Sequence, residues 1–270
     1  MKLLKDILYK VNLDLIHGDS GIGISHLCFD SRLVQKGSLF IAINGTLSDG
    51  HDFIEMAINS GAHAIVCEKL PLNINETVVY VLVKDSSKAL GYISANFYDN
   101  PSEKIKLVGV TGTNGKTTVA SLLHSLYQSL GHKSGLLSTV VYKIGLATYE
   151  ATHTTPDAIR LNGMLREMVD SGCKYCFMEV SSHALVQERT SGLSFAGGIF
   201  TNLSHDHLDY HKTFKDYRDV KKTFFDQLPK EAFALSNFDD KNGEYILQNT
   251  LADKKSFSIN SYSDYNAVIL

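Results

Sequence analysis

The sequence has few of the residues that mark several special classes of protein. Four cysteines in 270 residues are too few for a disulfide scaffold, so a reducing compartment, the cytoplasm, is expected. Only four prolines are present and 44% of residues are hydrophobic, which argues against collagen-like and disordered chains. No apolar run approaches the ~20 residues of a membrane-spanning helix. The formal charge of −3 argues against a broad basic face, and so against a nucleic-acid partner.

The two ends of the chain lead to different expectations. Residues 1–10 carry charges throughout, so we expect an amphipathic helix there and no export signal. Residues 266–270 end on apolar side chains after a polar stretch, like a strand that has just begun. We therefore expect the sequence to be the front part of a longer protein.

Apolar, β-rich runs alternate with helical patterns, which predicts an α/β fold. In the first hundred residues we expect strands at 38–43, 64–67 and 78–83 and helices at 53–58 and 86–98. Asn100 and Pro101 disfavour helix and mark a turn. The chain is therefore predicted to have one domain over residues 1–100 and a second over residues 101–270.

The second domain is predicted to contain a mostly parallel sheet with helices on both faces. Strands are expected at 105–110, 175–180, 198–201 and 233–236, and helices after the loop at 112–115 and at 213–228. Another helix is expected to begin at Thr155, whose hydroxyl would cap it, with Pro156 and Asp157 in its first turn. Gly172 would end that helix.

A glycine-rich loop follows the expected strand at 105–110. It consists of Gly112, Thr113, Asn114, Gly115, Lys116, Thr117 and Thr118. Glycines let backbone N–H groups approach phosphate oxygens, and the helix end that follows adds partial positive charge. Lys116 can reach terminal phosphates, and the Thr117 hydroxyl can bind Mg²⁺. The usual pattern has glycine where Val110 stands, so a strand–helix turn without a ligand is the alternative.

Two further groups of polar residues lie where strands of this sheet would end. Glu179 is the one acid of an apolar strand, and is either placed to hold Mg²⁺ and position water or simply exposed at the strand end. Residues 201–211 contain three histidines and two aspartates within seven positions, which suits a divalent metal. A binuclear metallohydrolase is one interpretation, although Tyr210 breaks its usual spacing, and a polar loop is another.

The helix expected at 213–228 carries a lysine among its apolar residues. At 100° per residue, Lys221 falls in the middle of the apolar stripe, whereas Lys222 lies well off it. The stripe consists of Phe214, Tyr217, Phe224, Phe225 and Leu228. A lysine there must extend to solvent, pair with an acid or lose its charge. A desolvated amine has a lowered pKa and can react with carbon dioxide to give a carbamate, an anion able to bind Mg²⁺.

Cys173 and Cys176 have C-x-x-C spacing. A zinc site needs two more ligands, and the other two cysteines, Cys28 and Cys67, lie in the first domain. A redox pair would precede a helix, whereas these cysteines lead into a strand. We therefore expect both to be structural.

Together these motifs resemble the Mur ligases of bacterial cell-wall synthesis, and most closely the members that add the third, diamino residue of the stem peptide. The resemblance rests on residues 112–118, 179–183 and 201–211 with Lys221, and on residues 29–32 and 37–42 in the first domain. It covers nearly the whole chain. It implies a small uridine-binding α/β domain, then an ATP-binding central domain that is incomplete here, with the third domain of the family absent.

The resemblance implies an ATP-dependent amide ligase that adds a diamino acid, meso-diaminopimelate by preference, to UDP-N-acetylmuramoyl-L-alanyl-D-glutamate. The γ-phosphate of ATP would pass to the glutamyl carboxylate, and the incoming amine would displace phosphate from the acyl phosphate. ATP and Mg²⁺ are thus the implied cofactors. The implied enzyme is a cytoplasmic monomer.

The resemblance also assigns roles to residues at matching positions. The ATP loop is 112–118, and the implied catalytic residues are Lys116, Glu179, His207 and Lys221. Mg²⁺ would be held by Thr117, Glu179, His207 and carbamylated Lys221. Nucleotide-sugar contacts are assigned to Ser31, Thr46, Leu47 and Ser48. Contacts to the muramoyl-peptide are assigned to His153, Thr154, Thr155, Ser181, Gln187 and Arg189.

The sequence departs from the family at two of these motifs and leaves other functions open. The family often has Asn where His153 stands and Arg where His205 stands. A chain without the third domain could bind nucleotides without catalysis, which makes a non-catalytic binding module one alternative. A folylpolyglutamate-type ligase shares the ATP loop but needs no uridine domain. The metallohydrolase is the remaining alternative.

Overall fold

The computed structural model describes residues 1–45, 48–204, 206 and 210–268. They form two compact units: the first comprises Met1–Asn100 and Glu188–Leu193, and the second comprises Pro101–Gln187 and Ser194–Leu270. The short segment Glu188–Leu193 therefore belongs structurally with residues far from it in sequence.

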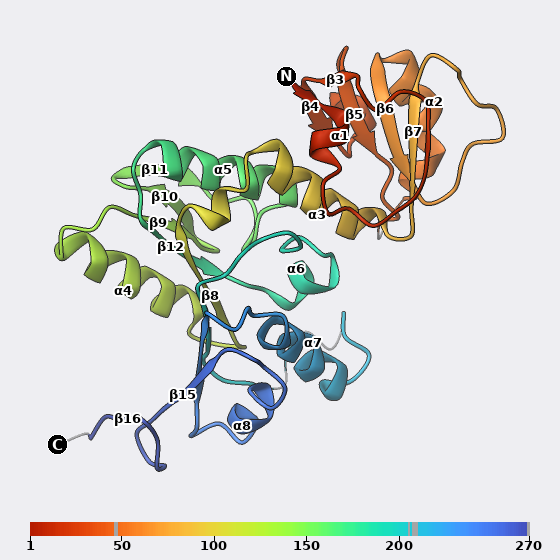
Figure 1. Ribbon diagram of the computed structural model, residues 1–270. Helices are drawn as coiled ribbons and strands as arrows, with labels where there is room; N and C mark the ends of the chain where they lie inside the picture. Colours follow the sequence, from red (N-terminus) through yellow and green to blue (C-terminus); the bar gives the residue numbers. More distant parts are fainter. Residues whose placement is uncertain (46–47, 205, 207–209, 269–270) are drawn as a thin grey trace. The chain divides into compact units, whose positions relative to one another are not determined.

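The first unit contains a five-stranded, mostly parallel sheet (Figure 1). Its order is β2 (Leu13–His17), β7 (Val79–Val83), β6 (Ala62–Cys67), β5 (Ser38–Ile41) and β4 (His26–Cys28). Only β2 is antiparallel to its neighbour. A small second sheet pairs β1 (Lys2–Leu3) with β3 (Gly23–Ile24). The helical segments are α1 (Leu4–Ile7), η1 (Ser31–Leu33), η2 (Gly50–Phe53), α2 (Ile54–Asn59) and α3 (Ser86–Phe97).

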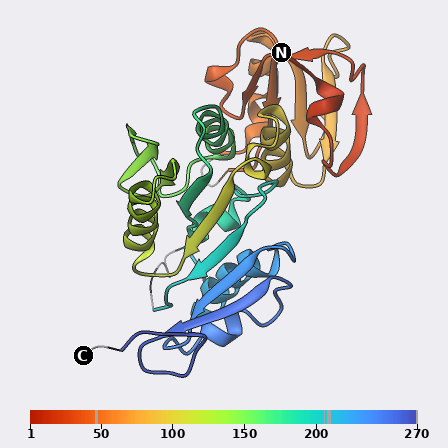
Figure 2. The same ribbon diagram turned by 60° about the vertical axis from the view of Figure 1, so that its left-hand side comes forward.

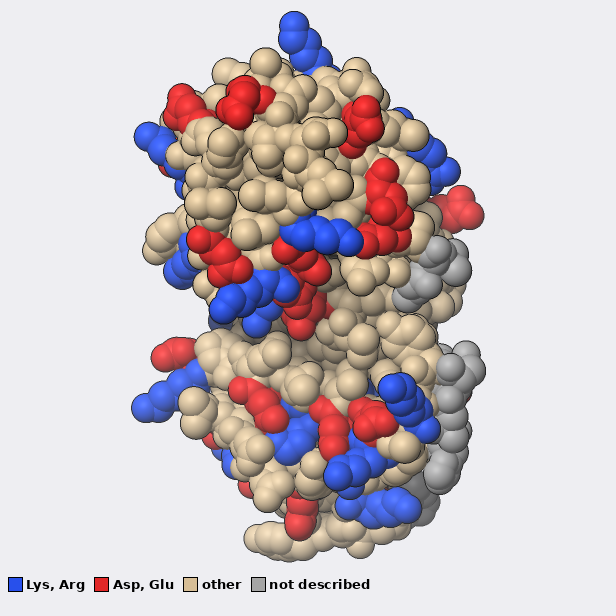
Figure 3. Space-filling view, turned by 90° about the vertical axis from the view of Figure 1, so that its right-hand side faces the viewer, with Lys and Arg blue, Asp and Glu red and all other residues tan. Residues whose placement is uncertain are grey.

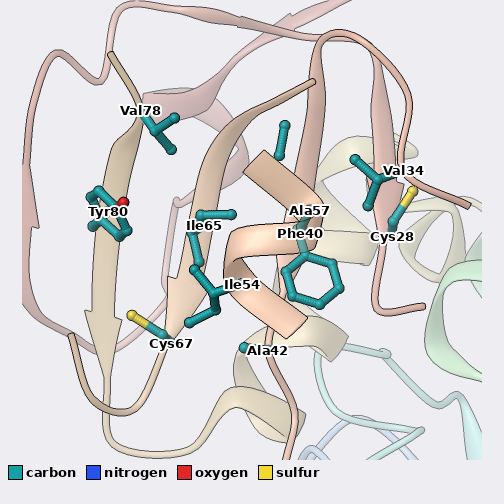
Figure 4. Close-up of a cluster of buried hydrophobic side chains, with 11 residues drawn as sticks. Cys28, Val34, Phe40, Ala42, Ile54, Ala57, Ile65, Cys67, Val78 and Tyr80 are labelled. Atoms are coloured by element: carbon teal, nitrogen blue, oxygen red, sulfur yellow. The ribbon is translucent and has the colours of Figure 1, made fainter. Parts of the chain in front are cut away.

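The core of the first unit lies between α2 and one face of this sheet (Figure 4). Phe40, Ile65 and Tyr80 come from three adjacent strands and pack with Ile54 and Ala57 of α2. All four residues of β5 are buried, as expected of a parallel strand that is covered on both faces. This packing fixes the strand ends from which the loops of the unit emerge.

The prediction of an amphipathic helix over residues 1–10 is wrong for most of that range. Lys2 and Leu3 pair with β3 as a strand, and only Leu4–Ile7 is helical. Leu4 and Ile7 are fully buried, so the apolar residues do face the core, but they belong to a single helical turn. Strand pairing with residues twenty positions away overrides the local helical pattern.

The second unit contains a nine-stranded sheet that is parallel over seven strands. Its order is β11 (Ala147–Glu150), β10 (Val141–Ile144), β9 (Ser134–Leu137), β12 (Tyr175–Glu179), β8 (Lys106–Thr111), β13 (Gly197–Phe200), β14 (Phe233–Asn237), β15 (Asp253–Ser258) and β16 (Tyr265–Asn266). Only β10 runs in the opposite direction, and it pairs antiparallel with both β9 and β11. The predicted α/β class and mostly parallel sheet are confirmed, whereas β9, β10, β11 and β15 were not predicted.

Helices cover both faces of this sheet, as predicted (Figures 1 and 2). One face packs on α4 (Lys116–Ser129), whose Ala120 joins Val108 and Val110 of β8 in the core. The opposite face packs on α7 (Phe214–Asp226): a Cβ at Gly109 would lie 2.5 Å from the Phe224 ring. The remaining helices are η3 (Pro101–Glu103), α5 (Ala158–Asp170), α6 (Ser182–Val186) and α8 (Gly243–Ile246).

The start predicted for the helix near residue 155 is wrong by three residues. α5 begins at Ala158, and the Asp157 carboxylate caps it by accepting from the backbone N–H of Arg160 at 2.9 Å. Thr155 does not cap the helix, because its hydroxyl donates to the backbone oxygen of Glu179 at 2.8 Å. A tertiary contact thus takes the hydroxyl that local sequence assigned to the cap.

The four cysteines are all free and buried. Burial raises the pKa of the Cys67 thiol to about 11 and raises the pKa of Cys173 and of Cys176. Thiols held in this protonated state are poor nucleophiles and poor metal ligands. The structure therefore supports the structural interpretation of the C-x-x-C pair.

On the face drawn in Figure 3, basic and acidic side chains are interspersed, in line with the small net charge. Among the described residues, every helix is too short or too polar to cross a membrane.

Candidate active site

The glycine-rich loop between β8 and α4 has the conformation that its sequence predicts. Gly112 and Gly115 both adopt positive φ, +148° and +83°. A Cβ on Gly112 would lie 2.0 Å from the Thr201 hydroxyl, so no other residue fits there. Gly115 is the N-cap of α4, and the N–H groups of that first turn have no acceptor within the helix. The loop is therefore built as an anion-binding helix end.

The segment after β13 holds the loop in this shape. The Thr201 hydroxyl donates to the backbone oxygen of Asn114 at 2.7 Å, and the Asn202 amide donates to the same oxygen at 3.0 Å. In return, the Asn114 N–H donates to Asn202 Oδ1 at 3.0 Å. Thr201 and Asn202 belong to the motif at 201–211, for which the sequence predicted metal-binding side chains and no role in supporting the loop. The structure shows that they support the loop.

Lys116 lies folded back against the loop. Its Nζ donates to the backbone oxygens of Gly112 at 2.9 Å and Thr113 at 2.7 Å. Burial lowers the pKa of Lys116, and the charges of Glu179 and Asp206 partly offset that shift. The ammonium group is thus held at the point where the loop can receive a phosphate.

Glu179 ends β12 beside the first turn of α4 and is 1% exposed. Its Oε1 accepts from the Thr117 hydroxyl at 2.8 Å and from the Thr139 N–H at 2.7 Å. Its Oε2 accepts from the Thr139 hydroxyl at 3.1 Å. Because Glu179 is buried, its interpretation as an exposed strand-end acid is wrong. All three of these donors are neutral. A buried carboxylate beside a hydroxyl offers the oxygen ligands that Mg²⁺ prefers.

Lys221 is buried beneath the loop and is 1% exposed, so it does not extend to solvent. Its Nζ donates to the backbone oxygen of Gly112 at 3.0 Å and lies 4.6 Å from the centre of the Tyr217 ring. Burial, reinforced by the charge of Lys116, lowers the pKa of Lys221 to about 7. A large fraction of this amine is therefore neutral near neutral pH, as carbamate formation requires.

Lys222, which the helical spacing places off the apolar stripe, is also buried. Lys222 is 5% exposed, and its Nζ contacts both carboxylate oxygens of Asp226 at 2.7 and 2.8 Å. The acid one turn later satisfies the charge, so this lysine can be buried without entering the apolar stripe. The two neighbouring lysines thus differ in partner: Lys221 contacts the loop, whereas Lys222 forms an ion pair.

Much of the histidine and aspartate cluster lies outside the described residues. His205, His207 and Asp209 belong to that part, so the role predicted for His207 in metal binding stays a prediction. His211 is buried, with its ring centre 5.1 Å from that of Tyr217. Within the described part of the chain, no three histidine, cysteine or acidic side chains cluster as a metal site would require.

Three residues predicted to contact the muramoyl-peptide gather around Glu179. The Thr155 hydroxyl, which donates to the Glu179 backbone oxygen, also accepts from the Ser181 N–H at 3.2 Å. The Thr154 hydroxyl lies 3.1 Å from the Thr139 hydroxyl. Thr139 was not predicted as a site residue. It could have been found only by recognising β9, the short strand before it.

The remaining residues predicted at the peptide site are distributed differently. His153 is held through its backbone, with its carbonyl oxygen accepting from the Tyr142 hydroxyl. The Gln187 amide donates to the Tyr210 hydroxyl at 3.5 Å. Arg189 lies in the segment Glu188–Leu193 of the first unit.

The first unit contains a cavity of about 560 Å³ where the nucleotide-sugar contacts were predicted. Ser31 and Ser48 both line it, with Phe29 and Phe53 among the other lining residues. The Asp30 carboxylate caps η1 by accepting from the Arg32 N–H, which fixes the turn that carries Ser31. Thr46 and Leu47 lie outside the described residues.

Two protein-family models match the chain. The model described as "Mur ligase family, catalytic domain" matches residues 23–98, and the model described as "Mur ligase middle domain" matches residues 110–269, more than half of the chain. The chain belongs to the Mur ligase family. Residues in both compact units of this Mur ligase are therefore matched by models of the family.

Curated relatives and a solved structure extend this finding. The UDP-N-acetylmuramoyl-L-alanyl-D-glutamate–2,6-diaminopimelate ligase of Cytophaga hutchinsonii is 54% identical over 99% of this chain and 55% of its own length. The ligase of the same name from Phocaeicola vulgatus is 50% identical over 100% of the chain and 56% of its own length. A solved structure of a ligase of that name superposes with a TM-score of 0.81 at 24% identity, over 98% of the chain and 54% of its own length. The Mur ligase chain thus spans just over half the length of these relatives.

Proposed function

We propose that this Mur ligase chain supplies the uridine-binding and ATP-binding parts of an ATP-dependent amide ligase that joins meso-diaminopimelate to UDP-N-acetylmuramoyl-L-alanyl-D-glutamate. The observation that carries the proposal is the contact of Thr117 with the buried carboxylate of Glu179, beside the loop that holds Lys116. The choice of substrates rests on the curated ligases that match nearly the whole chain.

The residues present fit a Mg²⁺ ion. A carboxylate from Glu179 and a hydroxyl from Thr117 are hard oxygen ligands, and the carboxylate is buried, with neutral hydrogen-bond donors in the described part of the chain. We propose His207 and carbamylated Lys221 as further ligands of bound cations. When bound, Mg²⁺ would neutralise charge on the phosphates and make the terminal phosphorus more electrophilic.

The reaction proposed brings two anions together, the glutamyl carboxylate and the terminal phosphate of ATP. The carboxylate oxygen attacks the γ-phosphorus and ADP leaves, which gives an acyl phosphate. The amine of the diamino acid then attacks the acyl carbon, and phosphate leaves with the former carboxylate oxygen. Lys116 and the N–H groups at the start of α4 lower the barrier by countering the negative charge.

The substrate contacts are proposed from the same positions. Ser31 and Ser48 in the cavity of the first unit would contact the uridine nucleotide, with Thr46 and Leu47 beside them. The muramoyl-peptide would contact His153, Thr154, Thr155, Ser181, Gln187 and Arg189. ATP and UDP-linked sugars are cytoplasmic compounds, so we propose that the enzyme works in the cytoplasm.

Phosphate release by the complete protein tests this function. We expect release from ATP only when UDP-N-acetylmuramoyl-L-alanyl-D-glutamate and diaminopimelate are both present, because the amine completes the reaction. Reactions that omit each substrate in turn are the controls, and lysine in place of diaminopimelate tests the choice of amine. Release that ignores the muramoyl-dipeptide contradicts the proposal, and release that requires a folate instead supports the folylpolyglutamate alternative.

A further inference from the structure

The turn between β9 and β10 carries a threonine that contacts two parts of the proposed active site. The Thr139 backbone N–H and hydroxyl each donate to a different oxygen of the Glu179 carboxylate, at 2.7 and 3.1 Å. The same hydroxyl lies 3.1 Å from the hydroxyl of Thr154, in the segment proposed to contact the muramoyl-peptide. Thr139 thus joins a proposed cation ligand to a proposed peptide contact.

The direction of these hydrogen bonds follows from the chemistry of the groups. A hydroxyl has one proton to donate, and an ionised carboxylate oxygen can only accept. The Thr139 hydroxyl donates to Thr154 Oγ1 at 3.1 Å and to Glu179 Oε2 at 3.1 Å, so its one proton is shared between two acceptors. Thr154, Thr139 and Glu179 thus form one hydrogen-bonded chain, in which the share of the proton that Glu179 receives depends on how strongly the Thr154 oxygen accepts.

Both ends of this chain are held in place. Glu179 is buried at the end of a central strand, and Thr155, next to Thr154, is fixed to its backbone by a 2.8 Å hydrogen bond. Tyr142 is fully buried and holds the backbone of His153 on the other side of Thr154. The Thr139 hydroxyl therefore lies between Glu179, which is buried, and Thr154, whose two neighbours in sequence are both held by hydrogen bonds.

We propose that Thr139 is a positioning residue that couples occupation of the peptide site to cation binding at Glu179. The inference rests on the function proposed above. An anionic group of the peptide that accepts from the Thr154 hydroxyl would make the Thr154 oxygen a stronger acceptor, which draws the Thr139 proton away from Glu179. Thr139 then becomes a weaker donor to Glu179. The carboxylate retains more of its negative charge for a cation, so peptide binding favours binding of a magnesium nucleotide.

Calorimetry on the complete protein measures this coupling without catalysis. The dissociation constant of Mg·ADP is determined alone, with UDP-N-acetylmuramoyl-L-alanyl-D-glutamate, and with UDP, which lacks the peptide. For the wild type we expect the muramoyl-dipeptide to tighten Mg·ADP binding by about 5-fold or more, and UDP to leave it unchanged. The same titrations are then made on Thr139→Val, Thr154→Val and Thr139→Ser.

The variants separate coupling from simple damage to the site. Thr139→Val removes both side-chain hydrogen bonds of the chain and Thr154→Val removes one of them. In both variants we expect the muramoyl-dipeptide to change the dissociation constant of Mg·ADP by less than about twofold. Thr139→Ser keeps the hydroxyl and is expected to behave as the wild type. Tightening that survives in Thr139→Val, or its absence from the wild type, overturns the role of Thr139. A wild-type protein that binds neither ligand overturns the proposed function itself.

Discussion

Replacing Lys116 by alanine is expected to lower turnover by roughly 10³-fold and to remove measurable ATP binding. The Lys116 ammonium is the one cationic side chain of the loop, and it is held by two loop carbonyls at the start of α4. Without it, the phosphates would lose the one side-chain cation of the loop and would retain the backbone N–H groups and bound Mg²⁺. Calorimetry with ATP and a phosphate-release assay on the complete protein measure the two effects.

Two controls show whether this loss is local. Lys230→Ala removes an exposed lysine of the same unit and is expected to leave both measurements unchanged. UDP binding by Lys116→Ala should also persist, because the cavity proposed for uridine lies in the first unit. Normal turnover by Lys116→Ala would contradict the assignment of the loop.

Replacing Lys221 by alanine is expected to lower turnover roughly 100-fold, with partial recovery when formate or acetate is added. The neutral amine reacts with carbon dioxide to give a carbamate and a proton, and the carbamate supplies the anion that the alanine variant lacks. A small carboxylate can enter the space left by the side chain and replace that anion. Turnover with and without added carboxylate is the measurement.

The matched control is the neighbouring residue. Lys222→Ala also removes a buried lysine, but one that contacts Asp226 and not the loop, so we expect lower stability without a need for carboxylate. Labelling with carbon-13 carbon dioxide gives a second readout by NMR. Because the pKa of Lys221 is about 7, the neutral amine becomes scarce below that pH, and the carbamate signal should fall with it. A fully active Lys221→Ala protein would remove the carbamate from the mechanism.

The phosphate loop could be predicted from sequence because its constraints are local. Gly112 and Gly115 stand where the backbone takes positive φ, and Lys116 opens the helix that follows. Lys221 could also be located, since helical periodicity alone places it on the buried face of α7. In each case one short segment contains all the information.

Features set by distant contacts could not be predicted in this way. Thr139 follows β9, a strand of four residues, one of which is glycine. So short a strand cannot be recognised without its neighbours β12 and β10. The Thr155 hydroxyl satisfied the rule for a helix cap, but the backbone of Glu179 binds it instead. The burial of Lys222 was not predicted either, because it depends partly on Tyr245, whose ring centre lies 5.7 Å from the Lys222 Nζ.

The path of one oxygen atom tests the central claim most directly. The glutamyl carboxylate of UDP-N-acetylmuramoyl-L-alanyl-D-glutamate is labelled with oxygen-18, and the complete protein is supplied with ATP and diaminopimelate. Mass spectrometry then determines the isotope content of the phosphate released. If the carboxylate attacks the γ-phosphorus, each phosphate carries one labelled oxygen from the peptide. Phosphate free of label, formed together with the amide product, would contradict an acyl phosphate and the mechanism built on it.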